Sequence, residues 1–116
     1  LMKIGINVNT VPVLDVLRSN TNKIIGFRSF SSNPKIVKEL GKFCVDKYKK
    51  RNIATVIKHI PGHGCSTLDS HIKMPKVKLK YKDLIKKDFY PFKSNPAKMA
   101  MTAHILYEKI DKKAWY

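Results

Sequence analysis

The stretch that decides the fold is NPKIVKELGKFCVDKYKKRNIATVIKHIPGHG, residues 33–64. Asn33 is a suitable N-cap, and Pro34 suits the first helical position because it has no N–H to leave unpaired. The apolar residues that follow recur at spacings of one, three and four, which predicts one apolar helix face. These residues are Ile36, Val37, Leu40, Phe43, Cys44 and Tyr48. The next run, residues 53–57, is short and rich in β-branched residues, so it predicts a buried strand that leads into a glycine-rich loop.

The segments on either side continue this alternation of strands and helices. Residues 4–9 alternate apolar and polar positions and, with VPVLDV after them, predict a strand that turns into a loop; residues 18–32 lack periodicity and predict a loop. A shorter helix is expected at residues 81–89, ending near Pro91, and an apolar strand at residues 99–103. This order predicts about three parallel strands joined by helical crossovers, which is the α/β class.

Composition limits the chain to one small domain or part of one, since it has 116 residues. Its 24 Lys+Arg against 8 Asp+Glu give a net charge of +16, which raises the question of a polyanionic partner. Only Arg18, Arg28 and Arg51 are arginine, however, whereas base readout and phosphate binding favour the guanidinium group. The lysines are also scattered, so we expect a solvated basic surface and no nucleic-acid partner.

Cysteine usage and hydropathy indicate the cellular compartment of such a chain. Cys44 and Cys65 form no CxxC pair and imply no disulfide framework, so a reducing compartment suits them. The apolar runs are too short for a signal peptide or a membrane span. We therefore expect a cytoplasmic protein.

Polar side chains lie at the ends of the predicted strands. Asp15, Lys58, His59 and His104 each lie at or just past the C-terminal end of one of them. In α/β barrels and doubly wound sheets, binding and catalytic sites are built at that edge. These positions therefore mark a candidate site.

The histidine-rich stretch KHIPGHGCSTLDSH, residues 58–71, permits several chemistries. His59 and His63 have the i, i+4 spacing of a zinc-binding helix, but Pro61 and the neighbouring glycines exclude a helix there. A metal could still be held by a loop. The candidate ligands for such a loop site are His59, His63, Cys65, Asp69 and His71.

Two further possibilities involve catalysis without a metal. Cys65 could act as a nucleophile with His63 or His71 as its base. Alternatively, Asp69 could fix the tautomer of His71 and make it a general acid/base near neutral pH. The second interpretation uses more of the stretch, because the loop glycines would let the chain pass close to a ligand or hinge over it. Lys58 and His59 at the rigid strand end would then bind a hydroxyl-rich ligand.

Four blocks of the sequence, in order, resemble one enzyme family. KHIPGHGCSTLDSH resembles the KHFPGHG...DSH signature of family 3 glycoside hydrolases, in the branch of bacterial β-N-acetylglucosaminidases with (β/α)8 barrels. INVNTVPVLDV (residues 6–16), GFRSFSSNP (residues 26–34) and MAMTAHILYEKID (residues 99–111) resemble NFAPVLDV, GxRSFSxDP and VMTAHVxYPxLD of the same family. The resemblance covers nearly the whole chain.

The resemblance implies a role for individual residues. His71 would be the acid/base that protonates the glycosidic oxygen and later activates water, with Asp69 as its partner. Arg28, Lys58 and His59 would bind the N-acetylated sugar next to the scissile bond. The reaction would retain the anomeric configuration through an aspartate nucleophile. No metal or organic cofactor is implied, and the substrates would be N-acetylglucosaminides, especially muropeptide fragments recycled in the cytoplasm.

The same resemblance implies that residues 1–116 are the central fragment of an N-terminal barrel domain. A (β/α)8 barrel needs about 250 residues and eight strands, whereas about three strands are predicted here. The nucleophilic aspartate of the family would lie beyond Tyr116, so we expect little activity from this chain alone, unless complementing segments of the same barrel are supplied. The alternatives are a small basic module that binds nucleic acid or another polyanion, and a decayed gene remnant.

Overall fold

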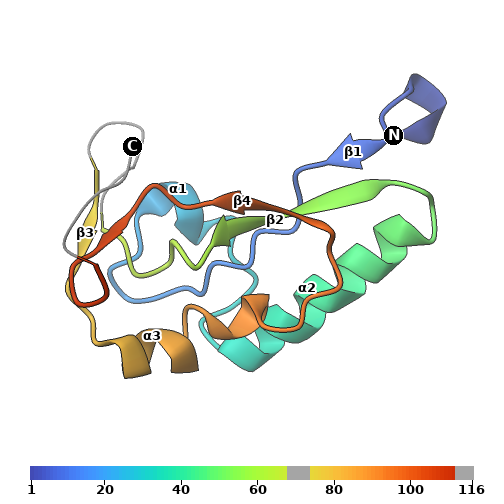
Figure 1. Ribbon diagram of the computed structural model, residues 1–116. Helices are drawn as coiled ribbons and strands as arrows, with labels where there is room; N and C mark the ends of the chain where they lie inside the picture. The colour runs from blue at the N-terminus through green and yellow to red at the C-terminus, as the bar shows by residue number, and fades with distance from the viewer. Residues whose placement is uncertain (68–73, 112–116) are drawn as a thin grey trace.

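The computed structural model describes residues 1–67 and 74–111, and their central feature is a parallel β-sheet. Across these two ranges it is a three-stranded sheet in the order β1 (Val8–Asn9), β2 (Ala54–Ile60), β4 (Met99–Thr102). Both pairings are parallel. Helix α2 (Pro34–Lys49) makes the crossover from β1 to β2. Figure 1 shows α2 running along the sheet. The predicted α/β class with about three parallel strands is confirmed.

The first strand is shorter than predicted. Met2–Ile4 form the 3-10 turn η1 instead of the start of a strand, and β1 comprises only Val8–Asn9. The chain meets β2 again further on, where Val13 forms a parallel bridge with Lys58 and Leu14 N–H donates to the Lys58 carbonyl at 2.7 Å. The VPVLDV segment therefore lies beside β2 and its buried residues enter the core.

Helix α2 begins where the sequence predicts. The Asn33 side chain accepts a hydrogen bond from Lys35 N–H at 2.9 Å, and Pro34 occupies the first turn. The buried face differs from the predicted one, since it consists of Val37, Gly41 and Val45. The helix approaches the sheet layer through Gly41, where an added Cβ would collide with the Leu14 side chain. This close approach turns part of the predicted apolar face outward, and the exposed residues are Ile36, Leu40 and Phe43.

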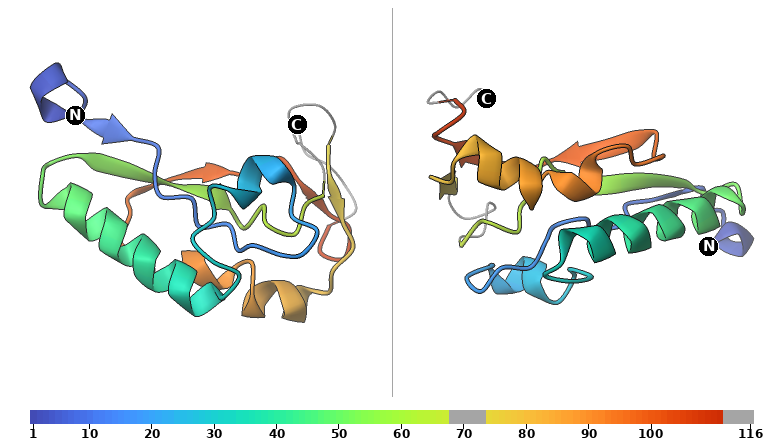
Figure 2. Two further views of the ribbon diagram at one scale, coloured as in Figure 1. Left: turned by 180° about the vertical axis from the view of Figure 1, so that it is seen from behind. Right: turned by 90° about the horizontal axis from the view of Figure 1, so that it is seen from below.

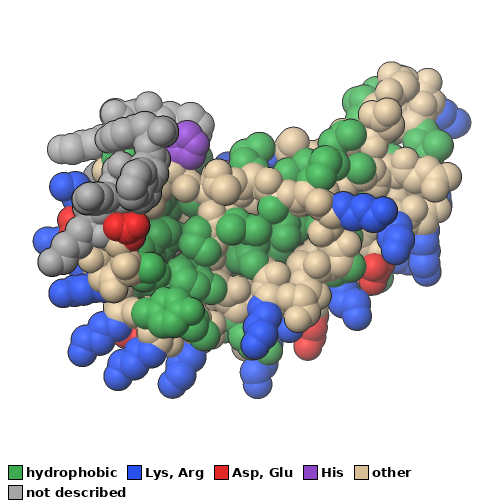
Figure 3. Space-filling view, viewed as in Figure 1, with side chains coloured by type: hydrophobic (Ala, Val, Ile, Leu, Met, Phe, Trp, Pro, Cys, Tyr) green, Lys and Arg blue, Asp and Glu red, His purple; other side chains and the backbone are tan. Residues whose placement is uncertain are grey.

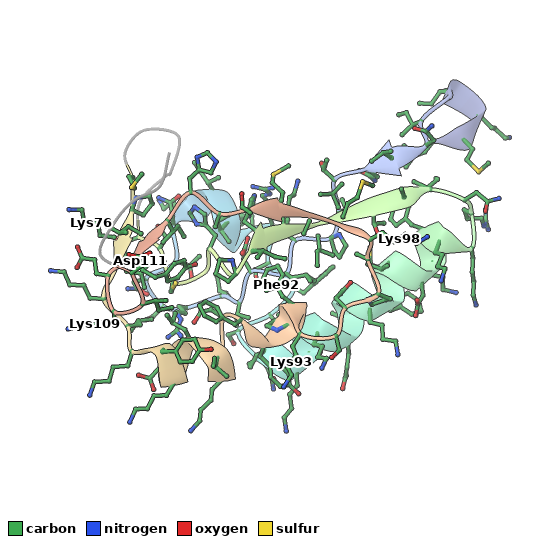
Figure 4. The ribbon with its side chains drawn as sticks, in the orientation of Figure 1. Lys76, Phe92, Lys93, Lys98, Lys109 and Asp111 are labelled. Carbon is green, nitrogen blue, oxygen red and sulfur yellow. The ribbon has the colours of Figure 1, made fainter. Side chains whose placement is uncertain are left out.

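Two apolar clusters hold the described residues together. The larger one lies between α2 and the sheet and consists of Leu14, Val16, Val37, Val45 and Ile57. Phe92, from the 3-10 turn η2 (Tyr90–Phe92), packs against this cluster and points from η2 toward the sheet in Figure 4. Figure 2 shows η2 beside the beginning of α2 from two further directions. The smaller cluster consists of Cys65, Val77 and Leu84.

Several local elements depart from the sequence-based expectation. The predicted loop at residues 18–32 contains the short helix α1 (Lys23–Gly26), and the helix expected at residues 81–89 ends early as α3 (Tyr81–Lys86). A two-stranded parallel sheet of β3 (Lys76–Val77) and β5 (Leu106–Tyr107) was not predicted. Strands of two residues carry no readable period, which explains the omission.

The sheet is open over the described residues. All four residues of β4 are exposed, and the strand expected to be fully buried, β2, buries only Thr55 and Ile57 of its seven residues. On the face of the molecule seen in Figure 3, hydrophobic side chains lie in the middle and Lys or Arg side chains lie mainly along the lower and right margins. No closed barrel forms within residues 1–67 and 74–111, as expected for part of a (β/α)8 barrel.

Candidate active site

Asp15 and His59 meet at the carboxyl edge of the sheet. The Asp15 side chain has no exposed surface, and its Oδ2 lies 2.7 Å from Nδ1 of His59. Oδ1 accepts the backbone N–H groups of His59 at 3.2 Å and His63 at 2.6 Å. A buried carboxylate requires such partners to offset its desolvation. The segment before α1 and the end of β2 are thereby fixed to each other.

Arg28 and Lys58 lie at one pocket of about 460 Å³. The pocket is also lined by residues 10–13, by Phe30 and, from α2, by Cys44 and Tyr48. Lys58 Nζ donates to Thr10 Oγ1 at 3.2 Å. Partial burial and the nearby Arg28 charge lower the pKa of Lys58 below its ordinary value, and Asp15 opposes this effect. Two cationic donors thus face one space, which suits a ligand rich in oxygen atoms.

His59 is not among the residues that line this pocket. Its ring contacts Asp15 and meets His63 edge-on at a centroid distance of 5.7 Å. Of the three residues predicted to bind sugar, the structure therefore places Arg28 and Lys58 at the pocket and His59 against the buried carboxylate next to it. His104, just beyond β4, is exposed.

The Pro61–Gly64 turn is held from several directions. Tyr107 donates its hydroxyl hydrogen to the Gly62 carbonyl at 2.6 Å, and Thr21 Oγ1 donates to the Gly64 carbonyl at 2.6 Å. Burial raises the pKa of Tyr107 above its ordinary range, so the hydroxyl remains a donor. Two side-chain hydrogen bonds from distant parts of the sequence thus hold the backbone of this turn.

The two glycines of this turn allow close packing against protein backbone. A Cβ on Gly62, whose φ is 143°, would lie 2.9 Å from the Cβ of Asp88, and a Cβ on Gly64 would collide with the backbone of Val16. The sequence suggested that these glycines approach a ligand or act as a hinge. In the structure these glycines pack against Asp88 and Val16 of the protein, and their approach to a ligand stays a prediction.

An ion pair that the sequence did not reveal lies next to the turn, because its Asp88 packs against Gly62. Arg18 Nε and Nη2 lie 3.1 Å and 2.5 Å from the two oxygens of Asp88, whose side chain is fully buried. The hydrogen bond to Asp88 raises the pKa of Arg18. Seventy positions separate the partners in sequence, so no local pattern predicts their contact.

The structure bears differently on the three roles that the sequence allowed for the histidine-rich stretch: a cysteine nucleophile, a metal site and an acid/base pair. Burial raises the pKa of the Cys65 thiol to about 12, helped by the negative charge of Asp88, so a nucleophilic role at neutral pH is disfavoured. No group of three candidate metal ligands occurs within the described ranges. Asp69 and His71, the predicted acid/base pair and two of the possible metal ligands, lie outside those ranges, so their assignment stays a prediction.

Comparison with known proteins confirms the family that the sequence motifs resemble. The model of the glycosyl hydrolase family 3 N-terminal domain matches residues 1–115. The chain belongs to glycosyl hydrolase family 3. Beta-hexosaminidase A of Pseudoalteromonas piscicida is 39% identical over 115 residues, which cover 96% of this chain and 19% of that protein. Beta-hexosaminidase of Hydrogenovibrio crunogenus is 34% identical over 114 residues, covering 96% of this chain and 32% of that protein.

A solved structure shows that the similarity to the family extends to the three-dimensional fold. The family 3 β-N-acetylglucosaminidase of Paenibacillus sp. FPU-7 superposes with a TM-score of 0.92 at 32% identity, covering 97% of this chain and 22% of that one. This family 3 chain thus spans between about a fifth and a third of these relatives. Over the described residues, no helix is long and apolar enough to cross a membrane.

Proposed function

We propose that residues 1–116 form the central part of the barrel domain of a retaining β-N-acetylglucosaminidase. The observation that carries the proposal is the grouping of Arg28, Lys58 and the Asp15-bound His59 at the carboxyl edge of a parallel sheet. Cationic and imidazole groups suit the hydroxyl and amide oxygens of an N-acetylated sugar. Terminal N-acetylglucosaminides, especially muropeptide fragments of the cell wall recycled in the cytoplasm, are the proposed substrates.

A relative with a bound sugar analogue supports this choice of ligand. The NagZ protein of Neisseria gonorrhoeae has been solved in complex with N-trifluoroacetyl-D-glucosamine. This chain superposes on it with a TM-score of 0.86 at 32% identity, over 94% of this chain and 33% of that one. An N-acylated glucosamine is therefore a reasonable ligand class for the same segment here.

The proposed chemistry divides between this segment and another part of the barrel. His71 would donate a proton to the glycosidic oxygen as the bond to the leaving group breaks, and would then take a proton from the attacking water. Asp69 would hold the imidazole and stabilise its charged form. A carboxylate nucleophile from a different strand would form the covalent glycosyl intermediate. Arg28, Lys58 and His59 would fix the sugar during both steps.

A chimaera tests this proposal. The segment of the Hydrogenovibrio beta-hexosaminidase that aligns with this chain is replaced by residues 1–116, and hydrolysis of p-nitrophenyl N-acetyl-β-glucosaminide is measured. We expect His71→Ala to lower kcat by about 10²–10⁴-fold, the usual contribution of a general acid/base. Lys58→Ala should mainly raise KM, whereas the exposed Lys49→Ala on α2 serves as a matched control and should change neither. An unchanged kcat in a folded His71→Ala chimaera would contradict the acid/base assignment.

A further inference from the structure

The two oxygens of Asp15 have different partners at the sheet edge. Oδ1 accepts two backbone N–H groups, from His59 at 3.2 Å and from His63 at 2.6 Å. Oδ2 faces Nδ1 of the His59 ring at 2.7 Å. Since backbone amides can only donate, the orientation of the carboxylate is determined, and one oxygen is left for the imidazole.

This arrangement decides where the proton of a neutral His59 lies. An ionised carboxylate can only accept hydrogen bonds, so Nδ1 of His59 must carry the hydrogen that it donates to Oδ2. The other ring nitrogen, Nε2, is then an acceptor. Over the described residues Nε2 has no hydrogen-bond partner, and the side chain keeps 16% of its surface exposed.

We propose that Asp15 is a positioning residue that holds His59 as the Nδ1–H tautomer, so that Nε2 accepts a hydrogen bond from a hydroxyl of the sugar. The choice of sugar rests on the proposed function, whereas the tautomer depends only on the Asp15–His59 contact. The buried carboxylate therefore acts on the ligand through His59 rather than by touching it. It also holds the Pro61–Gly64 turn at the same edge through His63 N–H.

The substitution Asp15→Asn makes a sharp prediction because it preserves shape and changes one set of hydrogens. The Asn oxygen should keep the two backbone donors, which leaves its NH2 group facing Nδ1 of His59. Two donors cannot bond to each other, so Nδ1 must become the acceptor and the ring proton must move to Nε2. The group offered to the sugar then changes from an acceptor to a donor.

The test reads the tautomers directly. The 116-residue chain is labelled with ¹⁵N-histidine, and long-range ¹H–¹⁵N correlations of the imidazoles are recorded near pH 8, with His59→Gln used to assign the signal. We expect His59 as Nδ1–H in the wild type and as Nε2–H in Asp15→Asn, while the exposed His104 is Nε2–H in both. A wild-type His59 in the Nε2–H form overturns the proposal, even if the variant fails to fold. If the free chain gives poorly dispersed spectra, the same measurement is made on the chimaera.

A second readout separates the positioning role from the ligand. Binding of N-acetylglucosamine to the chimaera should weaken about tenfold in Asp15→Asn and in His59→Gln, as expected for one hydrogen bond. The double variant should lose no more than either single one, because Asp15 acts through His59. Additive losses would overturn that route. If the tautomers behave as stated but neither variant weakens sugar binding, the sugar contact of His59 fails and the role of Asp15 in fixing the tautomer stands.

Discussion

Burial sets the reactivity of Cys65, which the sequence left open as a nucleophile. The thiol is only 8% exposed and belongs to the smaller apolar cluster. Its surroundings disfavour the thiolate, and they raise its pKa from 9.0 to about 12. Because the thiolate is the reactive form, Cys65 should behave as a packing residue at neutral pH.

The raised pKa predicts a pH dependence of alkylation. In the folded chimaera with Cys44→Ala, and with any other cysteines replaced, the rate of iodoacetamide labelling at Cys65 should rise about tenfold per pH unit from pH 7 to pH 10. An ordinary thiol would level off near pH 9. Folding should also lose stability as the pH rises above 9, since the native state then binds more protons than the unfolded state. The rate is measured by mass spectrometry, and a plateau below pH 9 would show that the thiol is accessible and unperturbed.

The Arg18–Asp88 pair shows which residue-scale features escape sequence reasoning. Arg18 was noted only as one of three arginines, and Asp88 had no assigned role. Their contact forms only when the segment between β2 and β4, which contains Asp88, packs beside the segment between β1 and β2, which contains Arg18. No local spacing in the sequence encodes such a contact. By contrast, Arg28, Lys58 and His59 could be chosen beforehand because motifs name them, and Asp15 because strand ends meet at one edge.

At the scale of elements, local sequence signals predicted structure correctly where the residues that cause it are neighbours in the chain. The Asn33 cap and Pro34 fix the beginning of α2 through contacts within three residues, so the sequence contains the whole cause. The predicted buried face of α2 was wrong for Ile36 and Leu40. The close approach of Gly41 to Leu14 determines which side of the helix faces the sheet. Such a preference depends on a partner that the local sequence does not specify.

The Pro61–Gly64 turn provides a test of packing at this scale. A methyl group at Gly64 would collide with the backbone of Val16, which cannot move without disturbing Asp15 beside it. Gly64→Ala should therefore destabilise the chimaera by about 3 kcal/mol, the upper end of overpacking effects. Gly26→Ala is the matched control, because its nearest neighbour would be Leu17 Cδ1 at an ordinary 3.8 Å. Urea unfolding measures both, and equal midpoints would show that the turn adapts more easily than its contacts indicate.

At the scale of the whole molecule, exposed lysines occur on many elements of the described residues 1–67 and 74–111. Lys76, Lys93, Lys98 and Lys109 are exposed and belong to different parts of the chain (Figure 4). The net charge of +16 thus comes from lysines in many parts of the sequence. Since the basic residues of a nucleic-acid groove cluster on one face, a solvated basic surface stays the prediction for this chain.

The open sheet leads to the last prediction, which concerns the polypeptide of residues 1–116 by itself. Met99 and Met101 of β4 are exposed, and β4 lies at one edge of the sheet, where no further strand of residues 1–67 and 74–111 pairs with it. Because the proposed mechanism takes its nucleophile from a different strand of the barrel, this polypeptide should hydrolyse p-nitrophenyl N-acetyl-β-glucosaminide at least about 10³-fold more slowly than the chimaera. Adding the remaining segments of the Hydrogenovibrio relative as separate polypeptides should restore part of the rate, because they would cover β4 and complete the site. The rates of the chain alone, the complementing segments alone and their mixture are compared. Turnover by the chain alone at the rate of the chimaera, or a sharp cooperative melt of the chain as a monomer, would mean that these residues need no further barrel segments.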